Sequence, residues 1–252
     1  MQAFILAAGF GTRLKFWTDR HPKALVPVGG IPMLHRTIDT LSAFGFNKIA
    51  VNVHHFSDQI VEYLSNRNFN ADIRISDETD RILDTGGALL KLAEDKIWGN
   101  EPLLIHNVDI LSDADLKDIM ATHEKSCSDI SLVTSDRNSS RKLVFGKDSR
   151  LIGWHDLKNN LYKPTDLKVQ EIQCQEVAFS GIYVISPSVK RWLKIYSEEI
   201  SNEVFPIMDF LLWGMDKINI GEIKLDKLNL IDIGKPDSYQ KANELLASGT
   251  QV

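Results

Sequence analysis

The first half of the chain alternates between short apolar runs and segments whose apolar residues recur at helical spacing. The apolar runs predict buried strands at residues 4–7, 48–53, 71–75 and 102–105. The helical periodicity predicts helices at residues 33–44, 57–64 and 86–93, with Ser57 as the N-cap of the second. Strands that alternate with helices in this way favour a parallel sheet covered by helices on both faces.

After about residue 128 the pattern changes to strands joined by shorter connections. Strands are predicted at residues 130–134, 142–145, 151–154, 179–185 and 220–225, and helices at 201–215 and 236–246. Residues 249–252 are expected to form a frayed end. No repeat or linker divides the chain, so we expect one domain over residues 1–252. The expected fold class is α/β, a Rossmann-like, doubly wound sheet that is mixed but mostly parallel, with helices on both faces.

The composition narrows the class of protein. The 252 residues are 43% hydrophobic and 25% charged, which are ordinary globular values, and a net charge of −5 argues against general nucleic-acid binding. No apolar run reaches the roughly 18 residues of a membrane span, and the first residues lack a signal-peptide pattern. Cys127 and Cys174 show no pairing or metal spacing. We therefore expect reduced thiols in a cytoplasmic protein that binds neither nucleic acid nor membrane.

A glycine-containing segment, LAAGFGTRL at residues 6–14, follows the first predicted strand. Gly9 and Gly11 lack a Cβ atom, so backbone N–H groups there can approach an anion closely, and Arg13 adds a forked cation. The segment lacks the ending of a Walker A loop and the third glycine of a dinucleotide fingerprint. On local grounds alone, an ordinary strand-to-helix turn explains two glycines better than a phosphate site does.

Three further residues carry chemistry whose local interpretation is open. Pro22 and Pro27 stiffen the backbone around Lys23, which is then either a held site residue or a solvated surface charge. Asp109 follows an apolar strand. Taken in isolation, it is explained at least as well as a helix-capping residue as it is as a site residue. Asp232 alone is equally a turn residue.

The segments at residues 6–14 and 22–32, in this order and spacing, resemble the signature of the sugar-1-phosphate nucleotidylyltransferases. The resemblance continues through residues 84–89 (DTGGAL), 107–109 (NVD), 179–183 (FSGIY) and 231–236 (IDIGKP). It points to the short members that lack a C-terminal left-handed β-helix. It implies the nucleotide-diphospho-sugar transferase type of fold, with a nucleotide-binding half at about 1–128 and a sugar-binding half at about 129–252.

The resemblance also implies a role for each matching residue. Lys23 is expected on the α-phosphate and Arg13 on the departing β,γ-phosphates, as the two catalytic cations, while Asp109 and Asp232 hold Mg²⁺. Nucleotide binding is assigned to Leu6, Ala7, Ala8, Gly9, Gly11, Thr12, Arg13, Lys23, Thr85 and Gly86. Sugar binding is assigned to Asn107, Ser180, Gly181 and Arg141. The expected partners are a nucleoside triphosphate and a sugar 1-phosphate, bound by a monomer or homodimer.

The substrates are less defined than the family. The form Asp84-Thr85-Gly86-Gly87 favours UTP with N-acetylmuramate 1-phosphate, whose acidic lactyl group would suit Arg141. A mannose-1-phosphate guanylyltransferase is the nearest alternative. A cytidylyltransferase acting on a non-sugar phosphate and an inactive nucleotide-binding regulatory subunit are the others.

Several residues depart from the family pattern or stay open. Val108 stands where the family commonly has glycine, which leaves the backbone beside Asp109 undefined. The stretch after Arg13-Leu14 lacks the usual proline, which predicts a mobile loop. His54 and His55 lack a third ligand and are not expected to bind metal. The basic cluster Arg137, Arg141 and Lys142 is either ligand-facing or part of a solvated loop.

Overall fold

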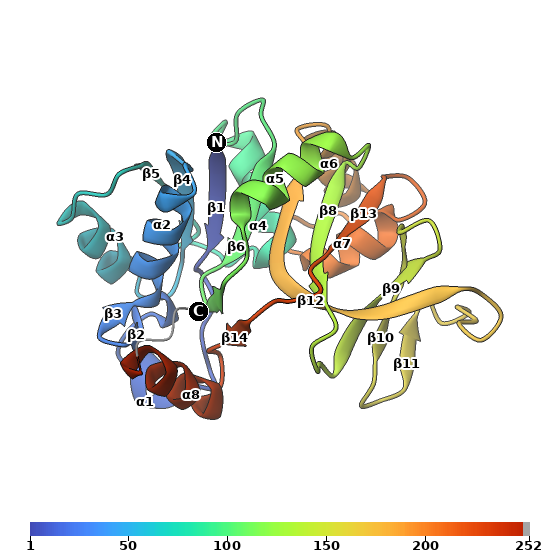
Figure 1. The fold of residues 1–252 in the computed structure, drawn as a ribbon. Helices are drawn as coiled ribbons and strands as arrows, with labels where there is room; N and C mark the ends of the chain where they lie inside the picture. The colour runs from blue at the N-terminus through green and yellow to red at the C-terminus, as the bar shows by residue number, and fades with distance from the viewer. Residues whose placement is uncertain (249–252) are drawn as a thin grey trace.

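One large mixed sheet runs through both halves of the chain in the computed structural model, which describes residues 1–248 (Figure 1). The frayed end expected at residues 249–252 lies outside the described residues. Neighbouring strands follow the order β11-β10-β9-β12-β6-β1-β4-β5, and β8 and β13 extend the sheet beside β12. The strands are β1 (Gln2–Leu6), β4 (Lys48–Val53), β5 (Asp72–Asp77), β6 (Leu103–Asn107), β8 (Ile130–Ser135), β9 (Arg141–Gly146), β10 (Leu151–Asp156), β11 (Leu161–Lys163), β12 (Cys174–Ile185) and β13 (Ile220–Lys224).

Strand direction divides this sheet into two parts. β1 runs parallel to β4 and β6, and β4 runs parallel to β5. β12 is antiparallel to β6, β8 and β9, and β9, β10 and β11 continue as an antiparallel ladder. In Figure 1, β12 is the long curved strand that passes from the parallel part to this ladder. The loops after the parallel strands therefore meet at one edge of the sheet, where α/β proteins bind ligands.

Helices cover both faces of the sheet. Alternate residues of the central strand face opposite sides, and both sides are apolar, so each needs a covering layer. On β1, Phe4 packs in one apolar cluster, while Ala3 and Ile5 pack in another. The helices against the Phe4 side are α4 (Asp84–Glu94), α6 (Val189–Glu199) and α7 (Ile207–Gly214), and those against the Ile5 side are α2 (Met33–Ala43), α3 (Ser57–Ser65) and α5 (Leu116–Lys125). This confirms the predicted α/β fold with a mixed, doubly wound sheet.

Smaller elements close the edge where the parallel strands end. They are α1 (Lys15–Thr18), the 3₁₀ turn η1 (Lys23–Leu25), β2 (Pro27–Val28), β3 (Ile31–Pro32), β7 (Ile110–Ser112), β14 (Leu230–Asp232) and α8 (Pro236–Ala247). Val28, Ile231 and Ala242 share a third apolar cluster, which attaches α8 to β2 and β14. The last part of the chain is thereby brought back beside the loop that follows β1.

The structure differs from the predicted elements in several places, and the short strands β2, β3, β7, β11 and β14 were not predicted. The helix predicted over 201–215 begins only at Ile207, because Pro206 excludes helical backbone at the residue before it, and α6 was not predicted. Ser57 is the first residue of α3 rather than its N-cap, which is Phe56 in a left-handed conformation (φ 53°). The stretch between Arg13 and Lys23, expected as a loop, contains α1. Among the described residues, no helix combines the length and apolar character that a bilayer crossing requires.

Candidate functional site

A cavity of about 470 Å³ opens at the edge of the sheet where the parallel strands end. The loop after β1, the residues after β5 and β6, and the first turn of α4 form its wall. Of the residues assigned from the sequence, it brings together Leu6, Ala7, Ala8, Gly9, Lys23, Thr85, Asn107 and Asp109. The first predicted motif and the NVD segment thus face one common space.

The backbone at the start of the glycine-containing loop is held by a side chain. Asn52 Oδ1 accepts hydrogen bonds from the N–H groups of Ala7 at 2.6 Å and Ala8 at 3.3 Å. Asn52 Nδ2 in turn donates to Glu78 Oε1 at 2.8 Å. These two N–H groups are therefore occupied within the protein. An anion at this loop would use groups further along, from Gly9 onward, where nothing lies within 4 Å of the Cβ position.

Glu78, at the carboxyl end of β5, is a cavity residue that the sequence reasoning missed. It is 3% exposed, and burial raises the pKa of its carboxyl group, while the hydrogen bonds from Asn52 and Leu83 oppose that rise. His54 Nδ1 donates to the Glu78 carbonyl oxygen at 2.7 Å. His54 therefore has a structural partner, and in the part of the chain that the structure describes no group of histidines and carboxylates forms a metal cluster.

Lys23 lies at the mouth of the cavity, where the two predicted motifs touch. Gly11 has a φ of +64°, and a Cβ atom there would lie 2.8 Å from Lys23 Cβ, so glycine is required for the close approach. Lys23 Nζ forms a salt bridge with Asp109 Oδ2, and the two side chains are only 13% and 16% exposed. Lys23 is thus a held site residue and not a solvated surface charge.

Asp109 and Asp232 converge because β14 returns to β7. The two short strands pair with Asp232 opposite Ile110, and the Ile233 N–H donates to the Asp109 carbonyl oxygen at 3.0 Å. A Cβ atom at Gly234 would lie 2.8 Å from Asp232 Oδ1 and 3.4 Å from Asp109 Oδ2. The two carboxylates therefore border one small space beside Gly234.

This pair of carboxylates fits a divalent metal ion such as Mg²⁺. Mg²⁺ prefers oxygen ligands and usually takes one or two carboxylates from the protein, with phosphates and water completing its shell. Two carboxylates without a third acidic group match that pattern. In this structure the Lys23 ammonium holds Asp109 Oδ2 and the Gly234 N–H holds Asp232 Oδ1 at 2.8 Å, so a metal would compete with Lys23 for Asp109.

Val108, which departs from the family pattern, does not distort the backbone beside Asp109. It is 4% exposed, and it is not among the described residues with a positive φ. Its N–H donates to the Leu6 carbonyl oxygen at 3.2 Å. A valine therefore fits between the cavity and the apolar core without the conformational freedom of glycine.

Two arginines lie near the paired carboxylates. The guanidinium of Arg13, whose side chain is exposed, would be 2.9 Å from a Cβ atom at Gly234, so the fork sits over the same small space. Arg137 is half-buried, and an Nη atom donates to the Phe179 carbonyl oxygen at 2.7 Å. Burial lowers the pKa of Arg137, and the nearby charge of Asp232 opposes that shift. Arg137 is therefore a cation of this site that the sequence placed only in a basic cluster.

The two residues assigned at the start of α4 have different surroundings. Thr85 lines the cavity, and its hydroxyl oxygen accepts a hydrogen bond from the Ile207 N–H at 2.9 Å. Gly86 is buried, and its N–H donates to the Phe205 carbonyl oxygen at 2.9 Å. A Cβ atom at Gly86 would overlap the Phe205 ring. Packing against Phe205 therefore accounts for this glycine.

The residues assigned to sugar binding do not all gather in one place. Gly181 has a φ of +82°, and a Cβ atom there would lie 2.8 Å from Asn107 Nδ2, so these two are neighbours beside the cavity. The Ser180 side chain is 1% exposed, and its hydroxyl oxygen accepts from the Ile182 N–H at 3.1 Å. Arg141 lies in a second cavity further along the antiparallel ladder. Thr12 is exposed on the loop that carries Arg13.

Comparisons with known proteins give one family and one fold. The family described as "Nucleotidyl transferase" matches residues 2–249. A mannose-1-phosphate guanyltransferase from Aspergillus oryzae is 31% identical over 214 residues, covering 82% of this chain and 55% of that protein. The chain thus spans about half the length of this curated relative.

Two solved structures superpose on nearly the whole chain. HddC from Yersinia pseudotuberculosis, also solved in complex with GMP-PN, has a TM-score of 0.75 at 23% identity and covers 97% of this chain and 99% of its own. A putative glucose-1-phosphate thymidylyltransferase from Bacillus anthracis, solved in complex with a sucrose, has a TM-score of 0.78 at 20% identity, with coverages of 97% and 94%. At these identities the likeness concerns the fold.

Proposed function

The chain belongs to the nucleotidyl transferase family, and we propose that it joins a nucleoside triphosphate to a sugar 1-phosphate and releases pyrophosphate. One observation carries this proposal, the convergence of Asp109 and Asp232 with the cations Lys23 and Arg13 beside a cavity of about 470 Å³. Two anionic substrates repel each other, so a site that brings them together needs fixed positive charge and precise alignment. The two cations and a carboxylate-bound metal would supply that charge.

The proposed reaction forms one P–O bond and breaks another. An oxygen of the sugar phosphate attacks the α-phosphorus of the triphosphate. The bond from the α-phosphorus to the oxygen that bridges to the β-phosphate breaks, and pyrophosphate leaves with that electron pair. The attacking oxygen is already anionic, so no side chain has to remove a proton from it.

The side chains then act by binding and orienting. Lys23 contacts the α-phosphate by exchanging its Asp109 partner for a phosphate oxygen, and Arg13 holds the departing phosphates through its planar fork. Asp109 and Asp232 hold the divalent metal, Mg²⁺ in this proposal, which supplies positive charge to the triphosphate when bound. The cavity between the β1 loop and α4 receives the base.

For the donor we place GTP first and UTP second. The glycine form of residues 84–87 favours UTP when the sequence is taken alone, but the contact with Phe205 explains Gly86 without any role in base recognition. The likeness to a mannose-1-phosphate guanyltransferase then supports GTP. Retention of both carboxylates and both cations argues against an inactive regulatory subunit.

The test measures pyrophosphate release with GTP, UTP, CTP and dTTP against a panel of sugar 1-phosphates and phosphocholine. We expect turnover with a sugar 1-phosphate and at least a ten-fold higher kcat/KM for GTP than for UTP, about 1.4 kcal/mol of transition-state preference. A preference for UTP overturns the choice of base alone. Turnover with phosphocholine only, or nucleotide binding without any turnover, overturns the proposed function itself.

A further inference from the structure

A second cavity, of about 410 Å³, lies between the antiparallel ladder and the start of α7. Strand register sets which side chains face it. Trp154 on β10 lies between Leu143 on β9 and Lys163 on β11, and Arg141 is two residues before Leu143 on the same strand face. Phe179 adds a second aromatic side chain to the lining. The cavity thus combines aromatic surface with two cations, Arg141 and Lys163.

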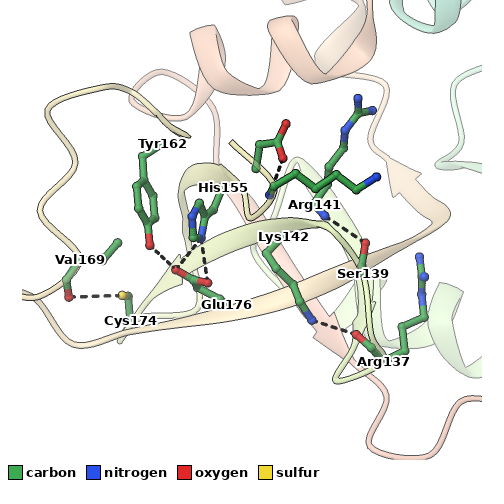
Figure 2. A network of polar contacts seen from close by, with 11 residues as sticks. Arg137, Ser139, Arg141, Lys142, His155, Tyr162, Val169, Cys174 and Glu176 are labelled. Atoms are coloured by element: carbon green, nitrogen blue, oxygen red, sulfur yellow. Dashed lines mark hydrogen bonds and ion pairs between the residues drawn. The ribbon is translucent and has the colours of Figure 1, made fainter. Parts of the chain in front are cut away.

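The neighbouring residues on the opposite strand face have other partners. Lys142 borders the cavity, but its ammonium group donates to the Arg137 carbonyl oxygen at 2.9 Å (Figure 2). In Figure 2, His155 and Tyr162 both reach Glu176, and the Tyr162 hydroxyl donates to its carboxylate at 2.8 Å. The basic cluster seen in the sequence therefore divides, because only Arg141 turns its charge to the second cavity.

The two cations that face this cavity are weakly neutralised. Lys163 Nζ is 3.9 Å from Asp209 Oδ1, and both side chains are about half exposed, so this ion pair contributes little. Arg141 forms no salt bridge within residues 1–248. The nearest carboxylate in the strand register is that of Asp156, which lies opposite Arg141 in the ladder. Hydrogen bonding from Asn159 is the main reason that the pKa of Asp156 is lowered, and Arg141 contributes least. Among the described residues, no carboxylate is therefore bound to Arg141 that an added anion would have to displace.

Neighbouring residues contact the second cavity and the site around Asp109 and Asp232 at two places. Arg137, whose charge acts on Asp232, donates to the carbonyl oxygen of Phe179, and the Phe179 side chain lines the second cavity. On the other side, Val204 lines the first cavity and Asp209 lines the second. The carboxylate pair and the second cavity are therefore separated by Arg137 and Phe179 on one side, and the two cavities by residues 204–209 on the other.

We propose that the second cavity binds an anionic substituent, a carboxylate or a phosphate, carried by the sugar 1-phosphate. Arg141 binds the substituent through its planar fork, Lys163 adds a second positive charge, and Trp154 packs against the apolar face of the sugar ring. Asp209 accepts a hydrogen bond from a ring hydroxyl. This inference rests on the proposed function and specifies its acceptor as an acidic sugar phosphate.

The experiment compares matched acceptors that differ in one acidic group. The pairs are glucose 1-phosphate with glucuronate 1-phosphate, glucose 1-phosphate with glucose 1,6-bisphosphate, and N-acetylglucosamine 1-phosphate with N-acetylmuramate 1-phosphate. We expect at least one acidic member to exceed its neutral partner in kcat/KM by about ten- to one-hundred-fold, the effect of a charge-assisted hydrogen bond. The pair that responds distinguishes carboxylate from phosphate.

Variants assign that preference to the second cavity. Arg141→Gln should remove most of the advantage of the acidic acceptor over its neutral partner, because the acidic group is the one that the fork binds. Lys163→Gln should have a smaller effect in the same direction. Lys147→Gln, an exposed residue of the β9–β10 hairpin, is the matched control and should leave both acceptors unchanged. Equal losses for both acceptors, or a neutral preference in all three pairs, would overturn the proposal.

A binding measurement separates this proposal from the proposed function. Glucuronate 1-phosphate should quench tryptophan fluorescence in wild type, but not in Trp154→Phe, and Arg141→Gln should weaken the binding by about ten-fold or more. Glucose 1-phosphate should bind more weakly to wild type and be insensitive to Arg141→Gln. If the protein turns over no acceptor but shows this binding pattern, the transferase proposal fails while the anion site stands.

Discussion

Lys23 and Asp109 neutralise each other in the site where we propose that a highly charged triphosphate binds. Both side chains are largely buried, at 13% and 16% exposure, so neither is easily left without a partner. Arrival of a phosphate would give Lys23 a new partner, and arrival of a metal would give Asp109 one. We therefore expect the salt bridge to keep both side chains in position until the proposed nucleotide and metal replace it.

Removing either carboxylate should abolish most catalysis without unfolding the protein. Asp109→Asn and Asp232→Asn each remove one of the two proposed metal ligands, and we expect kcat to fall by on the order of a thousand-fold or more. Excess EDTA should inactivate the wild type. Pyrophosphate release during a Mg²⁺ titration measures the effect. In urea denaturation Asp232→Asn should keep the wild-type midpoint, whereas Asp109→Asn should lower it and still show a cooperative folded state, because Lys23 loses its partner. Full activity of both variants, or of the wild type in EDTA, would contradict the metal assignment.

Arg13 should matter through its shape as well as its charge. Arg13→Ala should chiefly weaken pyrophosphate release and the reverse reaction, because its partner is the leaving group. Arg13→Lys should recover little, staying about ten-fold or more below wild type, since an ammonium group cannot form two parallel hydrogen bonds. Initial rates in both directions check this expectation. Wild-type kinetics for the alanine variant in both directions would place Arg13 outside the site.

For single residues, the sequence predicted a place in the site for those that lie in local motifs. Lys23 and Asp109 each lie in a recognisable segment, and the structure brings both to one cavity. Glu78 and Arg137 were not assigned, because their roles depend on partners far along the chain. The hydrogen bond from Asn52 to Glu78, and the charge of Asp232 beside Arg137, exist only after folding.

Helix α4 is held against the segment before α7 by a close contact that tolerates no side chain at Gly86. We expect Gly86→Ala to lower the free energy of unfolding by about 1–3 kcal/mol, because a Cβ atom would overlap the Phe205 ring and lie 2.9 Å from its carbonyl oxygen. Urea denaturation measures the loss.

Two variants serve as controls for Gly86→Ala. Gly9→Ala adds the same methyl group where nothing lies within 4 Å, so it should leave stability unchanged even though it borders the first cavity. Phe205→Leu replaces the ring by a smaller side chain. In that background Gly86→Ala should lower the free energy of unfolding by less than it does in the wild type. If Gly86→Ala has the same urea midpoint as the wild type, Phe205 does not restrict this position.

The helices and strands were predicted correctly where each has a clear apolar period of its own. The prediction was wrong where a proline or tertiary packing determines where a helix begins. The first-half strands and helices appear close to their predicted positions, because each has a clear apolar period. A single helix over 201–215 ignored Pro206, and the chain instead makes α6 and α7 with an irregular connection whose Phe205 is buried. A hydrophobic pattern alone does not show that such a connection packs against α4.

Across the whole molecule, stability should fall as the pH is lowered from neutral toward 4. His106 on β6 is 4% exposed, and burial lowers its pKa to about 4 from an ordinary 6.5. Below pH 6.5 the unfolded chain binds a proton that the folded chain does not, so folding is increasingly penalised until about pH 4. The loss attributable to His106 reaches about 3 kcal/mol.

Urea denaturation between pH 7.5 and 4 measures this slope. His106→Gln should flatten it, while His55→Gln, at a less buried position, should not. His123 is also buried, and burial lowers its pKa too, so some slope should remain in the His106 variant. A slope that is identical in wild type and His106→Gln would show that His106 takes up its proton without cost to folding.

The order of the strands in the sheet could not be predicted from the sequence. An α/β class with helices on both faces follows from alternating patterns, but the return of β14 to β7 joins segments with no local sign of contact. That return is what sets Asp232 beside Asp109. The family resemblance supplied this pairing where the residue pattern alone left each aspartate open.

The segment at residues 204–209 has one further consequence, for the thermodynamics of binding. Its Val204 borders the first cavity, its Phe205 fixes α4, and its Asp209 borders the second cavity. If filling one cavity shifts this segment, the free energy of filling the other changes, and such coupling is reciprocal. The factor by which nucleotide tightens or loosens acceptor binding must equal the factor by which acceptor changes nucleotide binding, and titrating each ligand with and without the other measures both.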